Sequence, residues 1–190
     1  MIDYVTDANH PHVGGNVRFG DHNSFTPMLW TQLIDRFAIR SLLDVGCGEG
    51  HAVRFFHRLG IIAHGIDGLE KNVRRAIHPI AFHDLTLGPY LMPVDFVLSI
   101  EVAEHIDEMY IDNYIDTLCN GNIIAMTHAI PGDEGGYHHV NCQPPQYWMD
   151  KLFVRGYRLD YYNDFWRDLA RKEREESFFG KSGLIFIKND

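Results

Sequence analysis

One short run of residues constrains the fold of this chain more than any other feature: Asp44-Val45-Gly46-Cys47-Gly48-Glu49-Gly50. It overlaps the end of an apolar segment, 41–45, that is typical of a buried parallel strand. It is followed by apolar residues at helical spacing, namely Ala52, Phe55, Phe56 and Leu59. Glycines at alternate positions let the backbone turn tightly and approach a ligand that a Cβ would block. The run therefore predicts a strand, a ligand-binding turn and a helix, with the ligand at the carboxyl end of the strand.

Strand and helix patterns alternate along the rest of the chain. Strands are predicted at 61–66, 79–83, 95–100, 122–127, 157–162 and 184–187, and helices at 27–37, 70–76, 106–118 and 144–153. Repeated β-α units give a parallel sheet, because right-handed crossovers place helices on both of its faces. We therefore expect one α/β domain at 26–190. Residues 1–25, rich in Gly, His and Asn, form an amino-terminal arm that is a candidate lid.

Composition and charge exclude several classes of protein. The chain is 45% hydrophobic and 23% charged, which is typical of a globular domain. No apolar run approaches the roughly 20 residues that span a bilayer, and the amino terminus lacks a signal-peptide layout, so we expect a cytoplasmic protein. The three cysteines, Cys47, Cys119 and Cys142, form neither a disulfide framework nor a metal signature. The net charge of −9 does not favour nucleic acid as a partner.

The spacing of the glycines argues against a dinucleotide-binding dehydrogenase. That class has G-x-G-x-x-G, whereas this turn has G-x-G-x-G, and His51 stands where the third glycine would be. Asp44 at the strand end also suits an ammonium group better than a pyrophosphate. A glycine-rich turn that binds no ligand is the structural alternative.

The order and spacing of these segments, over most of residues 40–187, resemble the class I S-adenosylmethionine (SAM)-dependent methyltransferases. The resemblance implies a doubly wound, mostly parallel seven-stranded sheet with helices on both faces and an antiparallel last strand, and it implies SAM as cofactor. Asp67 resembles the acid that accepts from both ribose hydroxyls. Asp84 resembles the acid that accepts from the adenine amino group, although it could equally begin a turn. The other expected cofactor contacts are Asp44, Gly46, Cys47, Gly48, Gly50, Leu85 and Glu101.

Methyl transfer requires that the acceptor be positioned and that its proton be removed. Candidate groups follow the strands at 95–100 and 122–127, and they are Glu101, His128, His138 and His139. Our preferred interpretation is methyl transfer to a hydroxyl group, with an amine as the alternative, of a small molecule or glycan. His139 or His138 is then the general base, and aromatic residues are candidates for stacking on the acceptor, among them Tyr137, Tyr147, Trp148, Phe165 and Trp166.

Three further hypotheses remain open. The sequence Glu101-x-x-Glu104-His105, with His138 or His139, could hold a divalent cation. A similar arrangement occurs in the small-RNA 3′-terminal ribose 2′-O-methyltransferases, where a metal grips adjacent ribose hydroxyls. The second hypothesis is therefore a metal-dependent ribose 2′-O-methyltransferase that acts on RNA. We do not favour a metal, because the acidic balance speaks against RNA and the same pattern is an ordinary helix start. The last hypothesis is a non-catalytic partner subunit that binds SAM.

Overall fold

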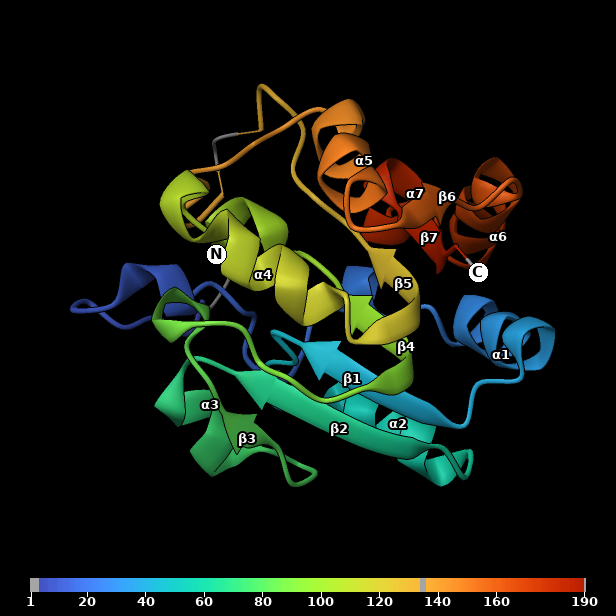
Figure 1. Ribbon diagram of the computed structural model, residues 1–190. Coiled ribbons are helices and arrows are strands. Elements are labelled where there is room, and N and C mark those ends of the chain that lie inside the picture. The colour runs from blue at the N-terminus through green and yellow to red at the C-terminus, as the bar shows by residue number, and fades with distance from the viewer. Residues whose placement is uncertain (1–3, 134–135, 190) are drawn as a thin grey trace.

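Seven strands form one sheet in the computed structural model of the chain, which describes residues 4–133 and 136–189. They are β1 Ser41–Val45, β2 Ile62–Asp67, β3 Ala81–Phe82, β4 Val94–Ser99, β5 Gly121–Met126, β6 Tyr157–Leu159 and β7 Leu184–Lys188. Their order across the sheet is β3-β2-β1-β4-β5-β7-β6 (Figure 1). Strands β1 to β5 pair in parallel, whereas β7 is antiparallel to both β5 and β6. The expected mostly parallel sheet with a reversed last strand is confirmed.

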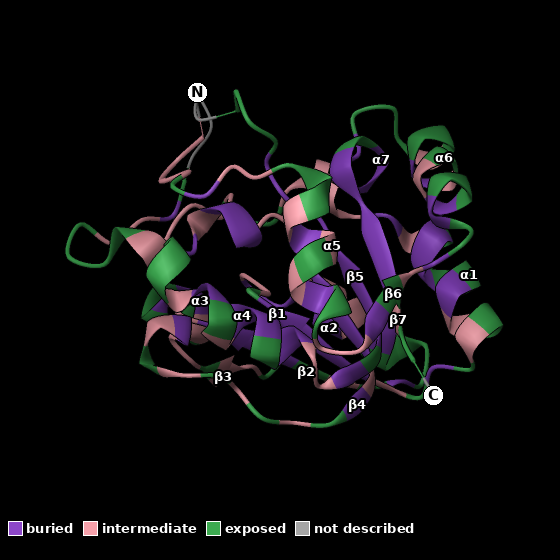
Figure 2. Cartoon of the chain, turned by 45° about the horizontal axis from the view of Figure 1, so that its top comes forward, coloured by how far each residue is buried: buried purple, intermediate pink, exposed green. Residues whose placement is uncertain are grey.

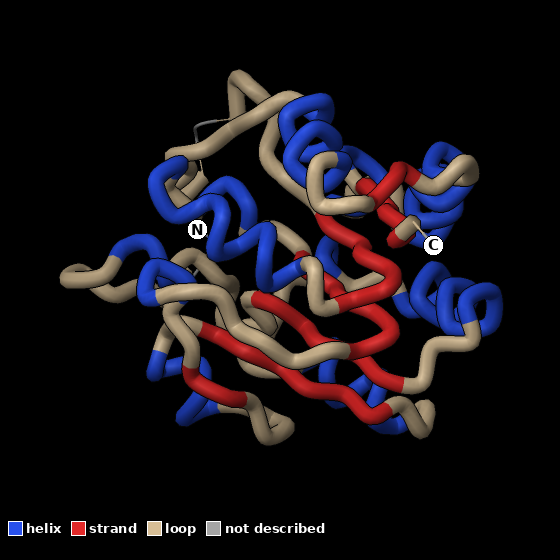
Figure 3. Tube along the Cα trace, viewed as in Figure 1, coloured by secondary structure: helices blue, strands red, loops and turns tan. Residues whose placement is uncertain are grey.

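Helices lie on both sides of this sheet (Figure 3). They are α1 Pro27–Phe37, α2 His51–Arg58, α3 Glu70–Arg75, α4 Ile111–Leu118, α5 Pro145–Phe153, α6 Asn163–Glu173 and α7 Phe178–Ser182. Single turns of 3-10 helix occur at Pro11–Val13, His22–Ser24, Leu85–Leu87, Ala103–His105 and Glu108–Tyr110. Within the described ranges, none of the helices has the length and apolar character needed to cross a membrane.

Each face of the sheet has its own hydrophobic core, because successive side chains of a strand point to opposite faces. On one face Leu43 of β1 and Val97 of β4 pack in a cluster with buried residues of α4 and α5. On the other face Leu42 and Phe96 pack in a cluster with buried residues of α1, α2, α6 and α7. Figure 2 shows the strands buried between these layers. Continuous apolar strands are therefore explained by burial on both sides.

Several elements differ from the sequence-based expectation, among them β6, which ends at Leu159 and not at 162. The predicted strand at 79–83 is reduced to Ala81–Phe82, an edge strand that pairs only with β2, and Pro79 has no N–H to offer a neighbour. Regular α-helix in the segment 106–118 begins only at Ile111. Helix α7 carried no recognisable pattern because it has only five residues.

The described part of the amino-terminal arm, residues 4–25, is ordered by hydrogen bonds to itself. Tyr4 and Val17 form an antiparallel bridge. The Val5 N–H donates to the Asn16 carbonyl oxygen at 2.8 Å, and the Gly15 N–H donates to the Val5 carbonyl oxygen at 2.9 Å. In Figure 1 this segment (dark blue) lies beside the carboxyl ends of β1 and β2. Residues 1–3 of the predicted arm lie outside the described residues.

We predict that truncation of Phe56 destabilises the fold strongly. Its ring is fully buried and lies 5.3 Å from the Trp30 ring and 6.2 Å from the Phe96 ring, centroid to centroid. Phe56→Ala should lower the free energy of unfolding in urea by about 3–5 kcal/mol. Phe153→Ala is the matched control, because that ring is 70% exposed, and it should change stability by less than about 0.5 kcal/mol. Equal effects of the two substitutions would contradict the described packing.

Candidate active site

The turn after β1 is built from glycines in the left-handed region of backbone space. Gly46, Gly48 and Gly50 have φ angles of +70°, +56° and +77°, which side chains with a Cβ adopt only with strain. A Cβ on Gly46 would lie 2.4 Å from Cγ2 of Val102, so this glycine also permits close packing of the segment after β4. A Cβ on Gly48 would meet no atom closer than 3.8 Å. The middle of the turn is therefore within ordinary van der Waals distance of Asn16 in the arm, without crowding.

Asp67, at the end of β2, is held in front of this turn. Its Oδ2 accepts a hydrogen bond from the Gly48 N–H at 2.8 Å. Its Oδ1 accepts from the Leu69 N–H at 2.8 Å and from Nδ2 of Asn72 at 2.9 Å. Burial raises the pKa of Asp67 to about 6, although these hydrogen bonds act to lower it. A carboxylate oxygen accepts about two hydrogen bonds, so Oδ2 keeps capacity for a ligand.

Asp44 and Cys47 line the same region, but their pKa values are not lowered by hydrogen bonds to the extent seen for Asp67. Burial, and then the neighbouring charge of Asp67, raise the pKa of Asp44 to about 8. Burial, followed by the charges of Asp44 and Asp67, also raises the pKa of the Cys47 thiol well above its usual value. Both side chains are therefore largely protonated at neutral pH in the absence of a positively charged ligand.

Asp84 precedes the single helical turn Leu85–Leu87 and accepts hydrogen bonds within it. Its Oδ1 accepts from the N–H and the hydroxyl of Thr86, at 2.9 and 2.8 Å. Its Oδ2 lies 3.1 Å from Nε2 of His12 in the arm. Both proposed roles of Asp84 are compatible with this position, because it begins the turn and also lines the cavity together with Leu85.

Glu101 follows β4 in a conformation that is unusual for a residue with a side chain, with φ of +55°. The hydroxyl of Thr127, at the end of β5, accepts from the Glu101 N–H and donates to Glu101 Oε1, both at 2.8 Å. Burial raises the pKa of Glu101, and the Thr127 hydrogen bond opposes this effect. The two hydrogen bonds fix the Glu101 carboxyl group beside the cavity.

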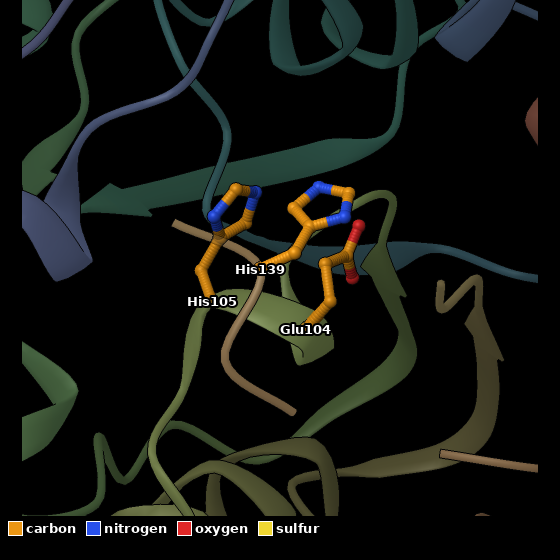
Figure 4. Close-up of side chains that lie close together, drawn as sticks. All are labelled: Glu104, His105 and His139. Atoms are coloured by element: carbon orange, nitrogen blue, oxygen red, sulfur yellow. The ribbon is translucent and has the colours of Figure 1, made fainter. Parts of the chain in front are cut away.

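Glu104, His105 and His139 form a cluster at the other end of the cavity (Figure 4). One ligand-type atom of each residue lies within 4.8 Å of those of the other two. Glu104 is completely buried; among the described residues no N–H or O–H donates to its carboxyl oxygens at full hydrogen-bond geometry, but its carboxyl group contacts that of Glu101. Burial, and then the charge of Glu101, raise its pKa well above the usual value. Burial lowers the pKa of His105 to about 4, so its imidazole is neutral at pH 7.

The backbone explains why His139 reaches this cluster although it lies 35 residues after Glu104 in sequence. The N–H groups of Val140 and Asn141 both donate to the Glu104 carbonyl oxygen, at 2.9 and 3.0 Å. Nδ1 of His139 lies 2.7 Å from the Asp133 carbonyl oxygen, which requires Nδ1 to be the donor. In the neutral ring Nε2 therefore carries the free lone pair, which can take a proton or bind a metal.

The other predicted histidines occupy different places. His138 and His128 are absent from the described residues that line the cavity, whereas His139 and Glu101 are present. His128 is buried against Trp148, with ring centroids 5.9 Å apart. Of the predicted stacking residues, Tyr137 lines the cavity and Trp148 is fully buried in the core. Glu134 and Gly135 of the histidine loop lie outside the described residues.

A single cavity of about 610 Å³ joins the glycine turn to the Glu104 cluster. Eight acidic residues line it: Asp21, Asp44, Glu49, Asp67, Asp84, Glu101, Glu104 and Asp133. Among the described residues that line it there is no lysine or arginine. The cavity therefore favours positively charged or neutral ligands and disfavours phosphates.

Four residues of this site were missed by sequence reasoning: Asn72, Thr127, His12 and Asn16. Asn72 and Thr127 each hold one of the predicted carboxyl groups. Thr127 stands at the end of a predicted strand, and that position was a usable signal. His12 meets a partner 72 residues away, so only the tertiary fold could reveal its contact.

Comparisons with known proteins agree on the fold. No protein-family model matches the chain. A ubiquinone biosynthesis O-methyltransferase of Caulobacter vibrioides is 36% identical over 77 residues, which cover 35% of this chain and only 31% of that protein. The sugar N-methyltransferase KedS8 of Streptoalloteichus superposes with a TM-score of 0.66 at 13% identity, over 91% of this chain and 90% of that one. A SAM-dependent methyltransferase of Archaeoglobus fulgidus superposes with a TM-score of 0.57 at 16% identity, over 87% and 95%.

We predict that Asp44 destabilises the free protein as pH rises. Its pKa is about 8 in the folded chain and about 3.9 in an unfolded one, so the folded state binds the proton more tightly. The free energy of unfolding should therefore fall between about pH 4 and pH 8. Asp44→Asn should raise it by at least about 1 kcal/mol at pH 7.5 and by less at pH 5, measured by urea denaturation.

Asp95→Asn is the opposite control. Burial alone would raise the pKa of Asp95, but hydrogen bonds from the N–H groups of Arg40 and Ser41 lower it overall. That substitution should therefore destabilise the protein at pH 7.5. If Asp44→Asn were also destabilising at pH 7.5, Asp44 would not carry the burial cost described here.

Proposed function

We propose that this chain, which has the fold of the class I SAM-dependent methyltransferases, transfers a methyl group from SAM to a hydroxyl group of an uncharged small molecule or glycan. The observation that carries the proposal is the single cavity that connects the glycine turn and Asp67 with Glu104, His105 and His139. One end of it offers the groups expected for the cofactor, and the other end offers groups that bind and deprotonate an acceptor.

The described residues fit the proposed cofactor. The cavity volume of about 610 Å³ lies within the range of about 300–1,000 Å³ that is usual for small-molecule sites. Oδ2 of Asp67 can accept from a ribose hydroxyl, and Gly48 lines the cavity without a side chain, so that a ligand can lie close to the backbone. The acidic lining suits the ammonium and sulfonium charges of SAM and does not suit the pyrophosphate of a dinucleotide.

The same charges bear on the acceptor. An RNA or a phosphorylated sugar would bring phosphates toward a cavity lined by carboxyl groups without lysine or arginine among its described residues. Such an approach is electrostatically unfavourable. A neutral polyol, phenol or glycan does not have this penalty, and Tyr137 offers an aromatic ring near His105 and His139 on which it can pack.

The residues of the cluster have separate tasks in this proposal. Bound SAM supplies the electrophilic methyl group. Nε2 of His139 takes the proton of the acceptor hydroxyl, since Nδ1 is committed to the Asp133 carbonyl oxygen. The imidazolium that results is stabilised by the charge of Glu101, with which His139 interacts electrostatically. His105, neutral at pH 7, orients the acceptor hydroxyl by a hydrogen bond.

A divalent cation is the second candidate for activation of the acceptor. The specific observation in its favour is Glu104, a completely buried carboxyl group that no donor of the described residues satisfies at full hydrogen-bond geometry and that contacts a second carboxyl group, Glu101. Such a group is costly unless a ligand satisfies it. Glu104, His105 and His139 offer one oxygen and two nitrogen atoms, a donor set that suits a transition-metal ion. A bound cation would lower the pKa of the acceptor hydroxyl.

We predict that S-adenosylhomocysteine (SAH), the demethylated product of SAM, binds the purified chain. Asp67→Asn should weaken this binding at least about tenfold, because a hydrogen bond to a charged group contributes about 1.5–3 kcal/mol. Isothermal titration calorimetry measures both. Asp35→Asn, an exposed position on α1, should leave SAH affinity unchanged. Absence of binding by the folded wild-type chain at millimolar SAH would refute the proposed function.

We predict that His139→Ala lowers the turnover of a hydroxylated acceptor by about 10²–10⁴-fold, because general-base catalysis is lost. SAH affinity should stay within about twofold, since the hydrogen bonds that hold Asp67 involve Gly48, Leu69 and Asn72 and not His139. His138→Ala is the matched variant, because its ring does not line the cavity, and it should retain near wild-type turnover. Equal turnover of His139→Ala and wild type would eliminate His139 as the base.

A metal chelator distinguishes the two proposed ways of activating the acceptor hydroxyl, by His139 as general base or by a divalent cation. If a cation is used, chelation should abolish turnover in the wild type while SAH binding persists. Glu104→Gln should then also lose tight binding of added Mn²⁺ or Zn²⁺ in a calorimetric titration. Full turnover in chelator leaves His139 alone as the activating group.

A further inference from the structure

The arm, residues 4–25, covers both ends of the cavity. At the cofactor end, Nε2 of His12 lies 3.1 Å from Oδ2 of Asp84, and both side chains are largely shielded, with 19% and 14% exposure. The Phe19 N–H donates to Oε2 of the buried Glu49 at 3.2 Å. A Cβ on Gly68 would lie 2.7 Å from Cγ1 of Val13, so the arm packs directly on the backbone that follows Asp67.

Asn72 connects the arm to Asp67, the carboxylate that we propose binds the ribose of the cofactor. Its Nδ2 donates to Oδ1 of Asp67 at 2.9 Å and to Oδ1 of Asn16 at 3.0 Å. The amide nitrogen must face Asp67, because two oxygen atoms would repel each other at this distance. Asn72 is 1% exposed; its hydrogen bond to Asp67 is buried and the one to Asn16 is partly buried. One buried amide therefore spans the interface between the cavity wall and the arm.

At the acceptor end, the arm packs on the catalytic cluster. A Cβ on Gly15 would lie 3.0 Å from Cε1 of His105 and 3.2 Å from Cδ1 of Tyr137. The Tyr4 and Tyr137 rings are 6.2 Å apart, centroid to centroid. Because one segment contacts both ends, its position affects the cofactor and the acceptor together.

From these contacts we propose that Asn72 is a positioning residue that couples the arm to Asp67, and that the arm closes over bound SAM and thereby completes the acceptor site. The inference rests on the proposed function, because SAM is the ligand that would occupy the cavity. A ligand of this size must enter before the arm closes, so SAM binds first and the acceptor second. By thermodynamic reciprocity, bound cofactor stabilises the closed arm as much as the closed arm stabilises bound cofactor.

Hydrogen–deuterium exchange of residues 4–25, with and without saturating SAH, tests the closure. SAH should slow exchange in this segment, where the N–H groups of Val5 and Gly15 hold the arm together. Asn16→Leu removes the acceptor for Asn72, and it should abolish most of this protection and speed SAH dissociation about fivefold. Asn16→Asp keeps an acceptor oxygen and should restore much of the protection, which a merely structural role of the side chain would not explain.

A matched control lies in the same segment. Asn9→Ala changes an exposed asparagine of the arm whose side chain makes no hydrogen bond within the described residues, and it should behave as wild type in both measurements. SAH binding without any change in exchange of residues 4–25 would overturn the closure and leave the proposed function intact. Absence of SAH binding would overturn both.

Discussion

Burial of carboxyl groups along one edge of the sheet is the constraint on which this site depends. Burial raises the pKa of Asp44 to about 8 and that of Asp67 to about 6, and it raises the pKa of Glu101 and Glu104 as well. Hydrogen bonds offset part of this cost at Asp67 and Glu101. Glu104 has only weaker contacts of this kind, with the Glu101 carboxyl group and the Ala129 backbone. Burying these carboxyl groups in their ionised form is unfavourable in the empty site. A positively charged ligand makes it favourable.

The two ends of the cavity therefore suit different ligands. The glycine turn and Asp67 combine hydrogen-bonding capacity with negative charge, which suits a cationic nucleoside. Glu104 lies beside two imidazoles that can each be a proton acceptor or a metal ligand. Because one cavity joins these two ends, a bound cofactor and a bound acceptor can lie next to each other, as direct methyl transfer requires.

The glycine turn was predictable from sequence because a local pattern determines it. A buried strand, three alternate glycines and an apolar helical face are adjacent in the chain, and the structure places them as expected. The mostly parallel seven-stranded sheet with its reversed last strand also followed from the succession of apolar segments and their resemblance to a known family. Short elements were less predictable: β3 has two residues and α7 has five, too few to show a period.

Contacts between distant segments could not be derived from sequence. His138 and His139 are neighbours of the same type, and only the hydrogen bonds of Val140 and Asn141 to the Glu104 carbonyl show which one reaches the cavity. His128 stands directly after a strand, as a catalytic residue would, yet its ring is buried near Trp148. The link from Asn16 through Asn72 to Asp67 depends on how the arm folds back over the sheet.

The contact between Gly46 and Val102 has a consequence for any effort to redirect this protein to new acceptors. The turn after β1 packs against the segment between β4 and Glu104 so closely that a methyl group on Gly46 would overlap Val102. A bulkier side chain at either position would displace both loops at once. Acceptor range and cofactor affinity are thus mechanically tied, and laboratory evolution should vary positions 46 and 102 as a pair.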